Sequence, residues 1–215
     1  MDFEIGRLLA TIDPALLART HVIFMGDNGT PKEVVAPPFL AYQAKGSPFE
    51  GGINVPLIVS PASSVQRYRY ALQPGVIGVG PMPGAQPGVC DALVTSTDIY
   101  KTITDIAGVD LKATLPPGYP TDSVSLLPYF AAPLRPSLRR YAYTELFKPN
   151  GFGPFEFNFR IARDERYKLI REPTTGEALF DLDFDPFEQV NLLSFPMTSG
   201  AARAYARLSA FIANP

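Results

Sequence analysis

The expected fold depends first on the stretch His21-Val22-Ile23-Phe24-Met25-Gly26-Asp27-Asn28-Gly29. Its β-branched and aromatic residues favour a buried strand, and the Gly-Asp-Asn-Gly sequence that follows is typical of a turn. A second apolar run covers residues 55–60 and stops at Pro61. Strands with so little polar alternation indicate a parallel sheet covered on both faces. We therefore expect such a sheet in the first part of the chain.

Helical periodicity surrounds these two strands. Apolar residues between positions 5 and 12 recur at helical spacing, and Pro14 breaks that helix or starts a second turn. The sequence Thr95-Ser96-Thr97-Asp98 is a helix start, with Thr95 as the cap. The predicted helix ends at Gly108 and buries Ile99, Ile103, Ile106 and Ala107. Alternating helices and strands predict an α/β fold.

The last third of the chain has a different pattern. Short strands are predicted at residues 141–145, 159–163, 167–171 and 178–182, with hairpin connections at 164–166 and 173–176. A final helix is predicted at 199–213. This pattern predicts a small antiparallel sheet with a helix packed on it. We divide the chain into residues 1–135 and 136–215.

Composition excludes several classes of function. The 215 residues carry a net charge of −2, which argues against a nucleic-acid partner. No apolar run approaches the roughly 20 residues of a membrane span. One cysteine, Cys90, and one histidine, His21, are too few for a closed zinc site. We interpret Cys90 as a buried inert thiol. His21 is either a structural residue or a general acid.

Two loops carry candidate ligands. Asp27 and Asn28 follow a buried strand directly, where ligands bind in α/β sheets, and their oxygens suit Ca²⁺ or Mg²⁺. The alternative is a plain turn. Lys45 lies in a loop with Glu50-Gly51-Gly52, and a lysine held there would be a compact cation for an anionic ligand. The alternative is a solvated loop lysine.

Taken together, these segments resemble type I sulfatases, of the alkaline phosphatase superfamily, in the carboxy-terminal portion of that family. Six matches occur in the family's order: residues 1–9, 22–29, 45–56, 91–94 with 98–108, 160–164 with 166–170, and 179–182 with 185–188 and 191–192. The resemblance covers nearly the whole chain. It implies part of an alkaline-phosphatase-like mixed sheet flanked by helices, followed by the small antiparallel sheet with its carboxy-terminal helix.

The resemblance also implies roles and ligands. Asp27 and Asn28 are similar to metal ligands of a calcium or magnesium site, and Lys45 to the lysine that holds the sulfate oxygens. Residues 1–135 would be the carboxy-terminal part of the catalytic domain. The implied substrate is a sulfate-ester small molecule or a sulfated saccharide, and the implied compartment is periplasmic or secreted. The oligomeric state is not implied.

The chain departs from the family at the nucleophile. The family's formylglycine arises from a Cys/Ser-x-Pro-x-Arg motif, which this sequence lacks. The resemblance implies that the formylglycine, the first metal-binding carboxylates and the catalytic histidines belong to an amino-terminal half preceding residue 1. We therefore expect no catalytic residue in this chain and no turnover by it alone. Within the lysine loop, Asn54 stands where an arginine is common.

Two other functions stay open. A phosphodiester or phosphonate hydrolase of the same superfamily would keep the metal and the lysine but use a different nucleophile. A non-catalytic module that binds an anion or a partner would use the same face without chemistry. Tight calcium binding by the isolated chain would favour the binding module.

Overall fold

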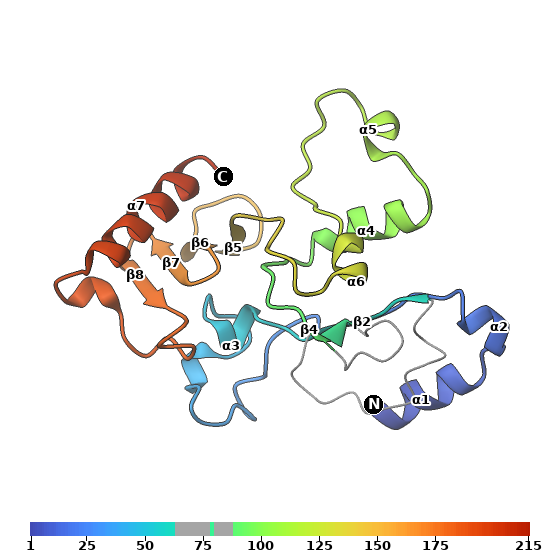
Figure 1. Ribbon diagram of the computed structural model, residues 1–215. Coiled ribbons are helices and arrows are strands. Elements are labelled where there is room, and N and C mark those ends of the chain that lie inside the picture. Colours follow the sequence, from blue (N-terminus) through green and yellow to red (C-terminus); the bar gives the residue numbers. More distant parts are fainter. Residues whose placement is uncertain (63–77, 80–87) are drawn as a thin grey trace. The chain divides into compact units, whose positions relative to one another are not determined.

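The computed structural model describes residues 1–62, 78–79 and 88–215 (Figure 1). The chain forms two compact units that are interleaved in sequence. The first unit is Met1–Gly26 with Pro56–Leu138, and the second is Asp27–Val55 with Arg139–Pro215. The division at residue 135 stays a prediction, because compact packing does not define the domain limits of a longer relative. Among the described helices, none combines the length and apolar character that crossing a bilayer requires.

The first unit contains a four-stranded mixed sheet. Its order is β1 (Val22–Met25), β2 (Leu57–Ser60), β3 (Gly78–Val79) and β4 (Gly88–Val89). Among the described strands, β2 pairs parallel with β3, whereas β1 pairs with β2 antiparallel through Val22 and Ser60, and β3 pairs with β4 antiparallel. The prediction of a parallel sheet was therefore wrong for the first two strands. An apolar run reports burial on both faces and carries no information on strand direction.

Helices and one apolar cluster complete the first unit. The predicted amino-terminal helix is α1 (Asp2–Ala10), and Pro14 starts α2 (Pro14–Leu17), whose first turn is capped by Asp13. The short helices α5 (Leu111–Thr114) and α6 (Leu127–Ala131) follow α4 (Asp98–Ile106). The buried cluster of this unit consists of Leu57, Val59, Cys90, Leu126 and Tyr129.

Helix α4 (Asp98–Ile106) buries a different face from the one predicted. Ile103 and Ile106 are 53% and 38% exposed, whereas Asp98 and Thr102 are buried. The Asp98 carboxylate accepts the backbone N–H groups of Thr95 and Val124, at 2.9 and 2.8 Å. The buried face is polar because it satisfies the backbone of residues 124–126, which apolar periodicity cannot indicate. Gly108 ends the helix with φ +71°, as expected.

The second unit contains the predicted antiparallel sheet. Its strands are β5 (Ala142–Lys148), β6 (Phe157–Arg163), β7 (Tyr167–Glu172) and β8 (Gly176–Asp181), in that order. Each strand pairs antiparallel with its neighbour in sequence. We call β5–β8 the carboxy-terminal sheet. The connection before β7 is fixed by the Asp164 carboxylate, which accepts the N–H groups of Arg166 and Tyr167.

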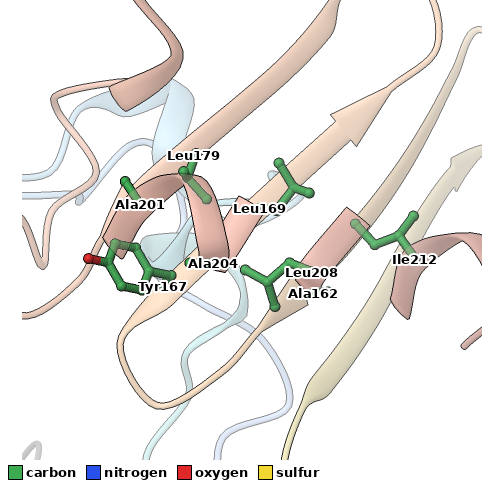
Figure 2. Packing of buried hydrophobic residues seen from close by; sticks show 8 residues of the cluster. All are labelled: Ala162, Tyr167, Leu169, Leu179, Ala201, Ala204, Leu208 and Ile212. Carbon is green, nitrogen blue, oxygen red and sulfur yellow. The ribbon is translucent and has the colours of Figure 1, made fainter. Parts of the chain in front are cut away.

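Helix α7 (Ser199–Ala213) covers one face of the carboxy-terminal sheet (Figures 1 and 2). Its bounds agree with the predicted helix, and the Thr198 hydroxyl caps its first turn. The strand residues that meet α7 are Ala162, Tyr167, Leu169 and Leu179, and the helix contributes Ala201, Ala204, Leu208 and Ile212. The predicted antiparallel sheet with a packed helix is therefore confirmed.

Residues 39–54 cover the opposite face of the same sheet. Neighbouring strand residues point to opposite faces, so Ile161, Ile170 and Phe180 face away from α7. They pack against Phe49 and Ile53. This segment carries the 3₁₀ turn η1 (Ala41–Gln43) and the helix α3 (Glu50–Ile53), while η3 (Leu192–Ser194) follows β8. The carboxy-terminal sheet is consequently covered on both faces.

Leu208 provides the test of this packing. Leu208 is fully buried between α7 and the sheet, so Leu208→Ala should lower the free energy of unfolding by about 2–5 kcal/mol. Urea denaturation followed by circular dichroism measures the change. Phe152→Ala is the control, because Phe152 is fully exposed and its removal should change stability by less than about 0.5 kcal/mol. Equal effects from the two substitutions would contradict the packing.

Candidate functional site

The two predicted ligand loops lie side by side in the second unit. We call residues 27–30 the metal turn and residues 43–54 the lysine loop. The Gly29 N–H donates to the Gly52 carbonyl at 3.1 Å, and the Lys45 N–H donates to the Thr30 carbonyl at 2.8 Å. These backbone bonds place the residues that follow β1 next to the loop that carries Lys45.

Glycines allow this close approach. A Cβ added at Gly29 would lie 2.1 Å from the Gly51 carbonyl oxygen, and one at Gly52 would lie 2.5 Å from the Ser47 carbonyl oxygen. Real Cβ atoms do not approach backbone so closely. A side chain at Gly29 would therefore force the two loops apart, and one at Gly52 would distort the lysine loop itself.

The three predicted ligand side chains are exposed on these loops. Asp27, Asn28 and Lys45 are exposed to solvent, and within the described ranges no ion pair or side-chain hydrogen bond engages them. Nor do the described residues contain a group of three or more His, Cys, Asp or Glu placed to hold a metal ion. Asp27 and Asn28 offer hard oxygen donors of the kind that calcium prefers, but calcium takes about six to eight. The two residues fit part of a calcium site.

A buried ion cluster fixes the lysine loop to the carboxy-terminal sheet. The Lys168 ammonium, on β7, lies 2.9 Å from Glu50 Oε1 and 2.8 Å from Glu188 Oε1. The Arg163 guanidinium lies 2.9 Å from Glu50 Oε2, and Glu188 Oε2 accepts the Glu50 N–H at 2.5 Å. We call Glu50, Arg163, Lys168 and Glu188 the ion cluster. Each carboxylate oxygen in it has a positively charged or N–H partner.

The two carboxyl groups of the cluster differ in their protonation equilibrium. Burial acts to raise the pKa of Glu50, but the charges of Lys168 and Arg163 outweigh it and hold that pKa below its ordinary value. Burial raises the pKa of Glu188, and the charge of Lys168 opposes this only in part. Glu50 has two cationic partners whereas Glu188 has one, so Glu50 is the better stabilised carboxylate.

A second set of contacts holds the lysine loop against residues 187–188. The Gln43 side-chain amide donates to the Phe187 carbonyl at 2.7 Å, and its oxygen accepts the Leu40 N–H. Glu188 has φ +55°, a left-handed conformation that costs a non-glycine residue about 1–2 kcal/mol. The contacts of its carboxylate and carbonyl compensate for that strain. The loop is therefore attached to the carboxy-terminal segment at two points.

The other sequence candidates lie in the first unit. His21 Nδ1 accepts the Ala62 N–H at 3.3 Å, and its ring lies 5.7 Å from that of Phe130. These contacts agree with a structural histidine. Cys90 is a free thiol buried in the apolar cluster, as predicted. Neither residue belongs to the unit that carries Asp27, Asn28 and Lys45.

Sequence reasoning missed the ion cluster. Glu50, Lys168 and Glu188 all lie in segments that resemble sulfatases, but no role was predicted for them. The available signal was Lys168 itself, a charged residue within an apolar strand, in Tyr167-Lys168-Leu169-Ile170. A lysine at that position is more often solvent-exposed, so the strand alone did not indicate burial.

Comparisons with known proteins show which proteins the chain is similar to. No protein-family model matches the chain. The chain is 27% identical over 199 residues to a choline-sulfatase of Rhizobium meliloti (strain 1021), and the match covers 91% of this chain and 31% of that protein. The chain therefore spans about a third of the length of this curated relative.

Solved structures share the fold. One is a protein in complex with its substrate, D-glucosamine-2-N,6-O-disulfate, with a TM-score of 0.64 and 20% identity over 98% of this chain and 37% of that chain. Another is a phosphonate monoester hydrolase of Agrobacterium radiobacter, with a TM-score of 0.63 and 23% identity over 98% of this chain and 38% of that chain. At this level of identity, the likeness establishes the fold alone.

The chain is similar in sequence to a sulfatase, and it shares its fold with a phosphonate monoester hydrolase. The similarity to a sulfatase agrees with the resemblance found in the sequence. The match extends over about 31–38% of these relatives, so it concerns one portion of a sulfatase-like fold.

The glycine contacts generate a prediction for the two loops. Gly29→Ala should separate the metal turn from the lysine loop, because the new methyl group would overlap the Gly51 carbonyl. We expect the Lys45 amide to exchange with deuterium at least ten-fold faster, measured by NMR. The matched control is Gly200→Ala in α7, where the added methyl makes only an ordinary contact at 3.4 Å. Unchanged exchange at Lys45 in Gly29→Ala would show that the loops do not depend on this contact.

Proposed function

We propose that this chain is a portion of a sulfatase that contributes half of the metal site and the anion-binding lysine. Asp27 and Asn28 would bind a divalent cation, Ca²⁺ or Mg²⁺, and Lys45 would bind the oxygens of a sulfate ester. The observation that carries this proposal is the pair of backbone hydrogen bonds joining the metal turn to the lysine loop. They hold the oxygen donors and the ammonium on adjacent loops.

The chemistry of sulfate-ester hydrolysis fits these residue types. Negative charge builds on the oxygens around sulfur in the transition state, and fixed positive groups stabilise it where it develops. A bound divalent cation would polarise the ester and offset that charge. Lys45 would contribute a second positive charge from a loop that is already held in place, so little reorganisation is needed.

The remainder of the proposal comes from the resemblance. The sequence contains no Cys/Ser-x-Pro-x-Arg motif, so a formylglycine nucleophile would have to come from residues outside it. We propose sulfuric ester hydrolysis for the complete enzyme and no turnover for this chain alone. The curated relative is a choline-sulfatase, and one protein of the same fold was solved with a disulfated glucosamine as its substrate. Both support a sulfated small molecule or saccharide as the substrate. A periplasmic or secreted location belongs to the same proposal.

One alternative is favoured by a specific observation. The likeness to a phosphonate monoester hydrolase supports hydrolysis of a phosphorus ester on the same fold. Methyl sulfate and methyl methylphosphonate are monoanions of similar shape, so their relative affinity for the chain separates the two readings. Preference for methyl sulfate supports the sulfatase, and preference for the phosphonate supports the alternative.

The proposed ligands can be tested by titration of the isotope-labelled chain. We expect CaCl₂ to shift the NMR signals of Asp27 and Asn28 and sodium sulfate to shift those of Lys45. Affinity should be weak, on the order of millimolar, because few ligands are present. Lys45→Met should weaken sulfate binding at least ten-fold, because it removes the charge and keeps an unbranched side chain of similar length.

Lys32→Met is the matched control, because Lys32 is an exposed lysine in the same unit but outside both loops. It should leave sulfate binding unchanged. Equal binding by the two lysine variants would contradict the role of Lys45. Tight one-to-one calcium binding by the chain would instead favour the non-catalytic binding module.

A further inference from the structure

The ion cluster engages the lysine loop at Glu50, the first residue of α3. Glu50 Oε1 contacts Lys168, Glu50 Oε2 contacts Arg163, and the Glu50 N–H donates to Glu188. All three partners come from the carboxy-terminal part of the second unit. Glu50 is therefore held from three directions, through both carboxylate oxygens and its backbone.

Packing alone does not require these charges. Desolvating an ammonium and two carboxylates is costly, and apolar residues of similar volume would often stabilise a core as well or better. Lys168 is 0% exposed, and its partners Glu50 and Glu188 are buried. What an ion cluster adds is a defined geometry, because its charges are satisfied only when the loop sits in one position.

Backbone contacts of the residues after Glu50 link it to the segment around Lys45. Helix α3 contains Gly51 and Gly52, whose backbone packs against the carbonyl oxygens of Gln43, Ala44 and Ser47 on either side of Lys45. Gly52 also accepts the Gly29 N–H of the metal turn. Because these contacts leave no space for a Cβ, a displacement of α3 would displace both ligand loops.

We propose that Glu50 is a positioning residue for Lys45 and the metal turn, and that the ion cluster is the device by which the carboxy-terminal sheet fixes the anion site. The inference deepens the proposed function and rests on it for the identity of the ligand. Whether Glu50 fixes the two loops does not depend on which ligand binds. Arg163, Lys168 and Glu188 would act by holding Glu50 in place, without contacting the substrate.

The test is amide hydrogen exchange of the full chain and its variants, followed by NMR. Glu50→Gln keeps the shape of the side chain and removes its charge. We expect the amides of Lys45 and Gly29 to exchange at least ten-fold faster, while the amides of β7 and β8 stay protected. The affinity for sulfate, measured from the shift of the Lys45 signals, should also fall at least ten-fold, although Lys45 itself is intact.

Glu177→Gln is the matched control. Glu177 pairs with Arg171 and accepts the Tyr205 hydroxyl, on the α7 side of the same sheet. Its substitution removes a carboxylate from the sheet without touching the lysine loop. We expect no selective change at Lys45 or Gly29. If Glu50→Gln leaves these two amides as protected as Glu177→Gln does, the proposal is overturned.

Arg163 offers a second pair of variants in case Glu50→Gln fails to fold. Arg163 is partly exposed and contacts only one oxygen of Glu50, so its loss should be tolerated. Arg163→Gln should speed exchange at Lys45 by a smaller factor, about three- to ten-fold, and Arg163→Lys should restore protection because it keeps the charge. Equal exchange in the Gln and Lys variants would overturn the electrostatic role.

The two proposals fail in different ways. If the wild-type chain shows no sulfate-induced shift at Lys45, the proposed anion site is wrong. The exchange comparison between Glu50→Gln and Glu177→Gln uses no ligand and still decides whether Glu50 positions the loops.

Discussion

The second unit depends on one buried ammonium. Lys168 lies at 0% exposure between two carboxylates, Glu50 from the lysine loop and Glu188 from the segment after β8. An unpaired charge in that place would cost several kcal/mol, so the strand, the loop and the carboxy-terminal segment must come together as a set. The strained backbone of Glu188 and the hydrogen bonds of Gln43 belong to the same arrangement.

This constraint explains how residues 39–54 are held on the second face of the carboxy-terminal sheet. One face packs on α7 through ordinary apolar contacts. The other carries Ile161, Ile170 and Phe180 beside Arg163 and Lys168, and residues 39–54 fold onto it. Apolar contacts supply most of the favourable free energy, while the charges select the position of the loop. A segment that precedes the sheet by about a hundred residues thereby becomes part of it.

Sequence patterns predicted the elements of this unit well. The four strands are short segments separated by clear turn signals, and the last helix has a capping threonine and an apolar stripe. The pairing of the metal turn with the lysine loop could be anticipated only through resemblance. The ion cluster could not be predicted, because Lys168 and Glu50 have the same local signature whether they face solvent or each other.

Two predictions for the first unit were wrong for physical reasons. The predicted parallel pairing of β1 and β2 was wrong, because an apolar run indicates burial and does not indicate the relative direction of two strands. The predicted buried stripe of α4 was also wrong. Asp98 and Thr102 are buried because they accept backbone N–H groups of residues 124–126, while Ile103 and Ile106 stay exposed. In both cases, distant segments decided the outcome. Local periodicity contains no information on such partners.

If Glu50 and Lys168 act together to hold the lysine loop, the effects of replacing them must be coupled. A double-mutant cycle of Glu50→Gln and Lys168→Met measures this, with the opening free energy of the Lys45 amide as the readout. We expect the double variant to be little worse than the more harmful single variant, with a coupling free energy on the order of 1–3 kcal/mol. Effects that add within about 0.5 kcal/mol would show instead that Glu50 and Lys168 act independently.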